Sequence, residues 1–353
     1  MKRATIKDVA RVAGVSTATV SFVLNNNRRE AITEVVRRRV LDAARELNYH
    51  PSAAAAALAR RRIRNVALLF YKSDDAITNA FYSFVVQGAI KEAVERDYNL
   101  LFSYVDVTYS GYQALPKAVR EKNAEGVLCM YRIDPRMVRD IQGLGIPVLA
   151  VDNFPRVPNL SAIQIDNRRG GRIAAEHLFS LGHREIAMLL PKDARPSIEE
   201  RLEGFQSAFE TFDLKFVRKN HVVQADTFTF QGGYEGAKRA FEQGKLTALF
   251  CANDEMAAGA LRAAHEAGVA VPEALSVIGF DNIMMSNFVD PPLTTVGVEK
   301  EHMGRRAMSR LIEIVEGGDR RVHTETAPVE LIVRKSTGKA RERPASPRAR
   351  SRR

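Results

Sequence analysis

The sequence predicts an all-α N-terminal domain followed by an α/β core of two doubly wound parallel-sheet subdomains. Residues 1–64 carry three amphipathic helical segments and no strand pattern. From residue 65 onward, roughly ten short apolar segments alternate with amphipathic helices, which is typical of parallel sheets covered on both faces. Ten strands are too many for one small doubly wound domain, so we expect two similar subdomains.

The first two helices form a helix-turn-helix pattern over TIKDVARVAGVSTATVSFVLN, residues 5–25. Thr5 and Asp8 have the spacing of a capping box, Gly14 tolerates the positive φ of a turn, and Ser16 is a good N-cap for the second helix. The outer face of that helix carries Thr17, Ala18, Thr19, Ser21 and Phe22. Such a face suits the DNA major groove, although two packed helices of an ordinary bundle give a similar pattern.

A third helix begins at Thr33 and has apolar residues at helical spacing up to Leu47, and Pro51 should end it. Five alanines follow at 53–57. Alanine is the strongest helix former, but a segment this short is not a stable helix alone in water. We therefore expect it to fold against a partner, and Leu58 followed by an arginine cluster favours DNA as that partner.

The net charge of +11 lies at the two ends of the chain. Residues 1–64 carry +9, residues 338–353 carry +6, and the segment between them carries −4. A basic N-terminal domain on a mildly acidic body is the charge pattern of a nucleic-acid-binding protein.

The last sixteen residues are rich in Arg, Pro and Ser and should be disordered. They are either an inert solvated tail or a source of non-specific DNA affinity.

Several classes of protein are disfavoured. No apolar run approaches the roughly 18 residues that span a bilayer, and the N-terminus lacks the apolar segment of a signal peptide, so we expect a cytoplasmic protein. Cys129 and Cys251 each lie in an apolar run and should be buried free thiols. The sequence shows neither GxGxxG after the first strand nor a P-loop. It offers no persuasive catalytic or metal-ligand set, so we expect a non-enzyme without a cofactor.

Six motifs occur in a fixed order along the chain: TIKDVARVAGVSTATVSFVLN, YHPSAAAAALA, LFSLGHREIAML, ANDEMAAGAL, VIGFDN and PPLTTV. In order and spacing they resemble the lactose/galactose repressor (LacI/GalR) family of bacterial transcriptional regulators. The resemblance implies a helix-turn-helix domain, a hinge helix that DNA orders, and a core like the periplasmic sugar-binding proteins. It also implies a homodimer on a palindromic operator and a small effector, sugar or sugar-like, between the two core subdomains.

On this basis the chain divides into four parts: residues 1–50 as the DNA-binding domain, 51–64 as hinge helix and linker, 65–337 as effector-binding core, and 338–353 as a disordered basic tail. The N-subdomain would contain about 65–165 and 297–325, and the C-subdomain about 166–296 and the last strand. The C-terminus lacks the leucine heptads of a tetramerising coiled coil. A dimer is therefore the expected state.

The resemblance also assigns DNA-binding positions. Base contacts fall on Thr17, Ala18 and Phe22, and phosphate-contacting or capping positions on Thr5, Ser16, Thr19, Ser21 and Asn25. In the hinge it adds Ser52, Ala55 and Leu58. Leu58 would act as an apolar wedge in the minor groove, unless it is a plain packing leucine.

The sequence departs from the family pattern at two of these elements. Many members carry an arginine where this chain has Phe22, and arginine reads guanine through two hydrogen bonds. Phenylalanine offers only apolar contact, so operators of other members should not be carried over. Ala56 also stands where the hinge often has an arginine. We hypothesise a hinge that is more helical without DNA than is usual, and complete lack of amide protection over residues 52–60 would contradict this.

For the effector site the resemblance points to Arg201, Phe228, Asn253 and Asp281 in the second subdomain, and to Phe81, Tyr82 and Asp152 in the first. Arginine and aspartate can hydrogen-bond vicinal hydroxyls, while an aromatic face stacks on a sugar ring or a base. Asp152 and Asp281 each follow an apolar strand, where α/β proteins bind ligands. The structural alternatives are a surface ion pair for Arg201, a cap for Asp281, and core packing for the aromatic residues.

Two other functions remain open. One is a solute-binding or sensory module without a regulatory DNA role, which the basic N-terminal helices argue against. The other is an architectural DNA binder whose core has lost its ligand. Neither the identity of the effector nor the sign of its coupling to DNA is encoded in a motif.

Overall fold

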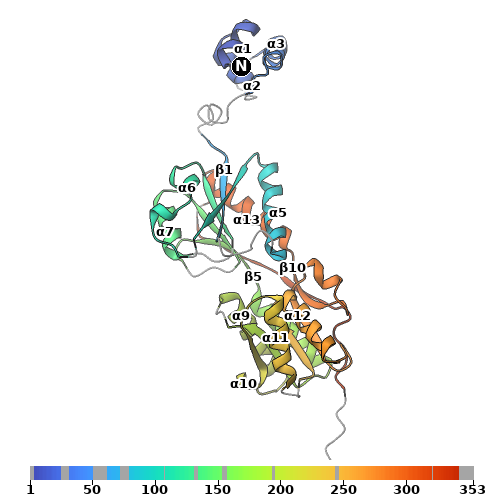
Figure 1. Ribbon diagram of the computed structural model, residues 1–353. Coiled ribbons are helices and arrows are strands. Elements are labelled where there is room, and N and C mark those ends of the chain that lie inside the picture. The colour runs from blue at the N-terminus through green and yellow to red at the C-terminus, as the bar shows by residue number, and fades with distance from the viewer. Residues whose placement is uncertain are drawn as a thin grey trace, which may run out of the picture.

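The computed structural model describes residues 4–24, 32–50, 62–71, 79–106, 108–130, 134–152, 157–192, 195–242, 246–319 and 321–341. These residues form a helical N-terminal domain and two α/β subdomains, which Figure 1 shows one after another. This is the fold class that the sequence predicts. Among the described helices, none is both long enough and apolar enough to cross a bilayer.

The N-terminal domain consists of α1 (Ile6–Ala13), α2 (Thr17–Leu24) and α3 (Glu34–Glu46). Val9, Val20 and Val40 are fully buried and hold the three helices together. The Thr33 hydroxyl accepts a hydrogen bond from the Val36 N–H at 3.4 Å and caps α3, as predicted. The helix ends at Glu46, before Pro51 is reached, because Asn48 takes a left-handed φ of 46°.

The first subdomain is built on a parallel sheet with strand order β11-β5-β4-β3-β1-β2. Its strands are β1 (Asn65–Tyr71), β2 (Asn99–Val105), β3 (Gly126–Met130), β4 (Val148–Val151), β5 (Ser161–Ile165) and β11 (Thr324–Ala327). Its helices are α5 (Ala80–Glu95), α6 (Lys117–Arg120), α7 (Pro135–Gly143) and α13 (Lys300–Val315), with η1 (Tyr112–Ala114). Helices α5 and α13 pack on one face of the sheet, and α6 and α7 on the other.

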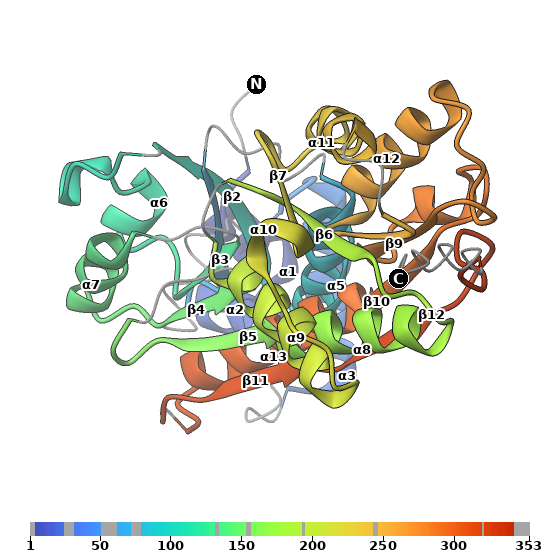
Figure 2. The same ribbon diagram turned by 90° about the horizontal axis from the view of Figure 1, so that it is seen from below.

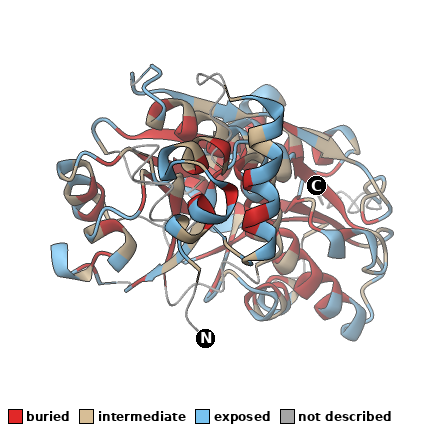
Figure 3. Ribbon diagram, turned by 90° about the horizontal axis from the view of Figure 1, so that it is seen from above, coloured by how far each residue is buried: buried red, intermediate tan, exposed pale blue. Residues whose placement is uncertain are grey.

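The second subdomain has a sheet in the order β12-β10-β9-β8-β6-β7, parallel except for the pairing of β12 with β10. Its strands are β6 (Ile186–Pro191), β7 (Val222–Ala225), β8 (Ala248–Cys251), β9 (Ser276–Asp281), β10 (Thr294–Val298) and β12 (Val329–Ile332). Its helices are α8 (Asn167–Ser180), α9 (Pro196–Thr211), α10 (Arg218–His221), α11 (Phe230–Glu242) and α12 (Asp254–Glu266), with η2 (Met284–Asn287). Figure 3 shows buried residues along the strands of the core.

Within the described residues the chain passes between the two sheets three times: Ile165 to Asn167, Val298 to Lys300, and Ala327 to Val329. Figure 2 shows the last passage, in which β11 leads into β12. Because β5 and β10 end where the chain crosses, and their neighbours β4 and β9 run parallel to them, the carboxyl ends of both sheets meet at the subdomain boundary. Loops that follow β4, β5 and β9 therefore supply the residues at that boundary.

One strand prediction is wrong in part. The sequence predicts one of its ten strands over residues 217–223, but residues 218–221 form the short helix α10, and β7 follows it. The His221 ring packs on Phe209 and its Nδ1 lies 2.9 Å from the Ile186 carbonyl oxygen, which fixes a helical turn before the strand begins. The chain leaves the second sheet after Val298, and β11 of the first sheet extends to Ala327.

Residues 338–340, the first part of the segment predicted as a disordered tail (338–353), are hydrogen-bonded to the core. The Gly338 N–H donates to Ser276 Oγ at 3.0 Å, and the Ala340 N–H donates to the Leu181 carbonyl at 2.9 Å. These bonds hold residues 338–340 on the second subdomain, while residues 342–353 lie outside the described residues. Cys129 and Cys251 are both free and buried, as predicted.

Candidate functional site

Local hydrogen bonds fix the helix-turn-helix that the sequence predicts. Asp8 Oδ2 accepts the Thr5 N–H at 2.9 Å and the Thr5 hydroxyl at 2.7 Å. Gly14 ends α1 in the left-handed conformation, with φ of 62°. The Thr19 N–H donates to Ser16 Oγ at 3.1 Å and starts α2. The second helix is therefore held at both its start and its buried face.

The predicted DNA contacts lie on the outer side of this pair of helices. Thr5, Ser16, Thr17 and Ala18 are exposed, and Thr19, Ser21 and Phe22 are partly exposed. The intervening Val20 and Val23 are buried. Helix α2 thus keeps its apolar face inward and offers the predicted base-contacting positions to solvent. Asn25, Ser52, Ala55 and Leu58 lie outside the described residues.

A second cluster of polar side chains lies at the subdomain boundary, around Arg201 of α9, which is 4% exposed. Arg201 Nε donates to Asn167 Oδ1 at 2.9 Å, and Nη1 donates to the Ala252 carbonyl. Nη2 lies 3.6 Å from Asp281 Oδ1. The guanidinium carbon also lies 3.5 Å from the centre of the Phe280 ring, so packing and polar contacts both fix this side chain.

Close packing of α8 against α9 sets the position of Arg201. A methyl group at Gly171 of α8 would overlap the Arg201 carbonyl oxygen, and one at Gly204 of α9 would overlap the Arg168 carbonyl oxygen. Glycine at both crossing points lets the two backbones touch. This brings Asn167, at the start of α8, within hydrogen-bond distance of the arginine.

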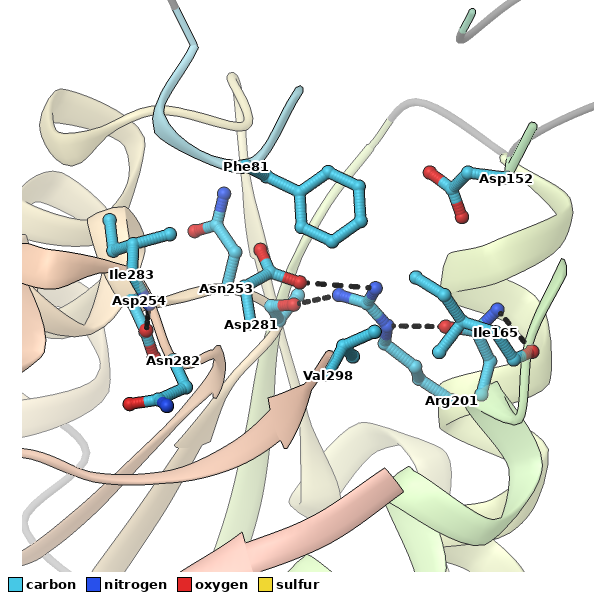
Figure 4. A network of polar contacts seen from close by, with 12 residues as sticks. Phe81, Asp152, Ile165, Arg201, Asn253, Asp254, Asp281, Asn282, Ile283 and Val298 are labelled. Atoms are coloured by element: carbon cyan, nitrogen blue, oxygen red, sulfur yellow. Dashed lines mark hydrogen bonds and ion pairs between the residues drawn. The ribbon is translucent and has the colours of Figure 1, made fainter. Parts of the chain in front are cut away.

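The first subdomain contributes the opposite side of the cluster. Asn79 caps α5 by accepting hydrogen bonds from the N–H groups of Phe81 and Tyr82. The Tyr82 hydroxyl donates to Asp152 Oδ2 at 2.7 Å. Figure 4 shows the Phe81 ring and the Asp152 carboxylate turned towards the Arg201 guanidinium. The facing ends of the two sheets therefore place an aromatic ring and a carboxylate opposite a buried arginine.

Asp281 ends β9 in an unusual backbone conformation. Its φ is 102°, in the region that favours glycine. Such a conformation costs of the order of 1–3 kcal/mol and persists only where the surrounding structure enforces it. Its carboxylate is turned towards Arg201 (Figure 4). Strain of this kind is concentrated at functional sites.

The charges in the cluster influence one another. Burial raises the pKa of the Asp281 carboxyl, while Arg201 and Lys300 oppose the rise. Burial lowers the pKa of the Arg201 guanidinium, and Asp281 and Asp152 oppose that change. Burial also raises the pKa of Glu200 beside them. The arrangement can exchange hydrogen bonds with a small polar molecule. The Phe81 ring beside it is 6% exposed and belongs to the hydrophobic core.

Two predicted effector residues have other contacts. Asn253 Oδ1 accepts the Met256 N–H at 2.8 Å and caps α12, and its side chain lies beside Asp281 in Figure 4. Phe228 is half-buried before α11, with the Arg195 guanidinium carbon 4.9 Å from its ring centre. Six of the seven predicted residues thus meet at the boundary: Phe81, Tyr82, Asp152, Arg201, Asn253 and Asp281. Phe228 contacts Arg195 and packs against the hydrophobic core of the second subdomain.

Comparison with known proteins identifies the family. Residues 5–52 match the lacI family of bacterial regulatory proteins, and residues 175–337 match a periplasmic binding protein-like domain. The HTH-type transcriptional repressor PurR of Photobacterium profundum is 32% identical over 94% of this chain and 98% of its own length. The protein belongs to the lacI family. It is a DNA-binding repressor with an effector-binding core, in a family of transcription regulators rather than enzymes.

Solved structures of lacI-family proteins share the fold. The Lac repressor dimer bound to operator and the anti-inducer ONPF aligns with a TM-score of 0.81 at 27% identity, over 96% of this chain and all of that one. A lacI-family regulator from Enterococcus faecium with bound ribose aligns with a TM-score of 0.70 at 26% identity, over 78% of this chain and all of that one. The helical domain and the two parallel α/β subdomains of this chain are therefore those of a Lac repressor-like regulator.

Sequence reasoning missed two residues of the Arg201 cluster in this lacI-family protein. Asn167 holds Arg201 Nε, and Lys300 contacts the backbone that follows β9. The sequence pattern could have predicted Asn167. It comes two residues after the apolar strand β5, as Asp152 comes directly after β4. Lys300 had none, since a lysine at the start of an amphipathic helix reads as a solvated residue.

Proposed function

We propose that this lacI-family repressor binds a palindromic operator as a homodimer and that a small sugar or sugar-like effector controls its affinity for DNA. The effector would bind at the Arg201 cluster. The observation that carries this proposal is the position of Arg201, buried at the boundary and paired with Asp281 of its own subdomain, opposite Asp152 and Phe81 of the other. A protein that regulates a bacterial operator works in the cytoplasm.

The geometry supports a ligand that links the two subdomains. Arg201, Asn253 and Asp281 come from the second subdomain, and Tyr82 and Asp152 from the first. A molecule with several hydroxyl groups would bond both sets at once. Because Arg201 is almost fully buried, the subdomains must separate for such a molecule to enter. Its binding would then favour one arrangement of the subdomains over another, which is the basis of effector control.

The exposed side of α2 supports the DNA-binding part of the proposal. Thr17, Ala18 and Phe22 would contact base edges, and Thr5, Ser16, Thr19, Ser21 and Asn25 would position the helix on phosphates or cap it. Phosphate contacts set the register and base contacts carry the sequence information. The hinge positions Ser52, Ala55 and Leu58 complete the proposed DNA-binding surface.

Exposed apolar residues support the homodimer. In the first subdomain, Phe102 and Tyr104 of the edge strand β2 are 46% and 48% exposed, and Val94 of α5 is 70% exposed. In the second, Met284 and Phe288 are 61% and 79% exposed. Edge strands with exposed aromatic residues favour association. A second copy of the chain would cover these surfaces.

Calorimetric titration of the full-length protein tests the effector site, with D-ribose as first probe and a panel of hexoses, sugar phosphates and nucleosides after it. A hit should raise the melting temperature and change the affinity for operator DNA selected from a random pool. Arg201→Met should abolish the binding of the hit, while Arg168→Met, which removes an exposed ion pair with Glu203, should keep it. Failure to bind any specific duplex, with or without these molecules, would refute the repressor function.

A further inference from the structure

Lys300, the first residue of α13, is buried at the second passage between the subdomains. Its ammonium group donates to three backbone carbonyl oxygens. The distances are 2.5 Å to Asp281, 3.0 Å to Asn282 and 3.2 Å to Val298. An ammonium group has three donors, so the three carbonyls satisfy it completely.

These carbonyls belong to the strained segment that carries the Asp281 carboxylate. Asp281 and Asn282 both have positive φ, 102° and 51°. From the other side, the Ile283 N–H donates to Asp254 Oδ2 at 2.8 Å, and the Asn282 N–H donates to Thr295 Oγ1 at 3.4 Å. The segment 281–283 is therefore fixed through its carbonyl groups by Lys300 and through its N–H groups by Asp254 and Thr295.

The helix that begins with Lys300 belongs to the first subdomain. Helix α13 packs against α5 so closely that a methyl group at Gly304 would overlap the Val85 carbonyl oxygen. One residue after Lys300, Glu301 accepts a hydrogen bond from Lys91 Nζ of α5 at 2.6 Å. Lys300 therefore joins the end of a strand in one subdomain to the start of a helix in the other.

Its position is otherwise unfavourable for a lysine. The N-terminus of a helix carries partial positive charge and disfavours a cation, and a buried charge is costly unless it is paired or hydrogen-bonded. Burial lowers the pKa of the Lys300 ammonium group, while Asp281, Asp254 and Glu299 oppose the change. The contacts with the 281–282 backbone are what offset these costs.

We propose that Lys300 is a positioning residue of the effector site. It holds the 281–283 backbone so that the Asp281 carboxylate faces Arg201, and it ties this segment to the first turn of α13. Movement of either subdomain is thereby transmitted to the residue that faces the effector. The inference rests on the proposed effector function of the Arg201 cluster, and its test separates the two.

Hydrogen exchange of the full-length protein tests the positioning role without any effector. In Lys300→Met, which keeps the length of the side chain and removes the donors, the Asn282 and Ile283 amides should exchange at least about tenfold faster, because the segment opens locally. Lys300→Arg should restore slow exchange by keeping a charged donor. Lys91→Met is the matched control, since it breaks the neighbouring contact with Glu301 and leaves segment 281–283 alone. If Lys300→Met does not fold by circular dichroism, Lys300→Gln replaces it.

Titration with D-ribose, or with the hit of the panel, gives the second readout. The affinity for the ligand should fall at least about tenfold in Lys300→Met, because the Asp281 carboxylate is displaced from its position. It should not fall in Lys91→Met. Unchanged exchange at 282–283 in a folded Lys300→Met protein would overturn the positioning role, and so would unchanged affinity. If the wild-type protein binds none of the probes, the effector proposal fails, and the exchange rates alone then decide whether Lys300 positions the segment.

Discussion

At the scale of single residues, Asp254 shows how a buried carboxyl is kept beside the Arg201 cluster. It is 1% exposed, and its two oxygens accept hydrogen bonds from Thr295 Oγ1 at 2.5 Å and the Ile283 N–H at 2.8 Å. Burial is the main reason that its pKa rises from the ordinary 3.8 to about 8, and repulsion from Asp281 adds to it. At neutral pH the folded protein therefore binds a proton here that the unfolded chain releases.

This proton makes stability depend on pH. Because the pKa of Asp254 is raised in the folded state, its contribution is full below about pH 4 and is lost as the pH rises towards about 8. Asp254→Asn keeps the shape and has no titrating group. Its free energy of unfolding should fall less steeply between about pH 5 and 8, by up to about 1 kcal/mol per pH unit, as measured by urea denaturation.

Asp226→Asn is the control for this prediction. Asp226 is exposed, and its hydrogen bond with Lys192 lowers its pKa, so it is ionised throughout that pH range. Its replacement should leave the slope unchanged between pH 5 and 8. Identical slopes for the wild type and Asp254→Asn would show that Asp254 is ionised in the folded protein.

At the scale of elements, helix α2 carries Phe22 at a position where many family members have an arginine. Phe22 is partly exposed while Val20 and Val23 on the same helix are buried. In Phe22→Arg, a guanidinium group replaces the ring and can bond guanine through two hydrogen bonds. Selection from random DNA should then shift towards guanine at one position of each half-site, by about tenfold or more.

Val12→Arg provides the matched control. Val12 is 44% exposed on α1, so the change adds the same charge to the same domain away from α2. It should raise affinity for all sequences through phosphate attraction without changing the selected sequence. A selection profile that is identical for Phe22→Arg and wild type would show that residue 22 does not face the bases.

The elements also show what the sequence can predict. Strands such as β1 and β6 are buried along their length, and their continuous apolar runs make them easy to locate. The segments TETA and VELI of β11 and β12 are mostly exposed or half-buried edge strands, and such strands lack an apolar run. Helix α10 was not predicted, because contacts of His221 with residues distant in sequence determine the conformation of this turn.

The candidate site likewise has residues that the sequence predicts and arrangements that it does not. Asp152 and Asp281 follow strands, so the parallel-sheet pattern predicts that they meet at one end of the sheets. The burial of Arg201 depends on the Gly171 and Gly204 contact between two helices, and the role of Lys300 depends on a passage between subdomains. Neither arrangement leaves a local pattern in the sequence.

At the scale of the whole molecule, three passages of the chain connect the two core subdomains. Relative motion of the subdomains is then limited to rotation or sliding about these passages, and it changes the surfaces on both subdomains together. A dimer that uses both subdomains would sense this motion. The exposed apolar residues of β2 and η2 lie one set on each subdomain, which fits this requirement.

Phe102→Glu tests this surface. The Phe102 ring lies 6.2 Å from that of Phe70, which is buried under α5, so Phe102 extends the apolar core to the exposed edge of the sheet. A carboxylate there would be buried without a partner in a dimer, and the dimer dissociation constant should rise at least about tenfold in sedimentation equilibrium. Tyr112→Glu, at an aromatic residue 42% exposed in η1, should not change it. Equal dissociation constants for Phe102→Glu and the wild type would place the dimer contact elsewhere.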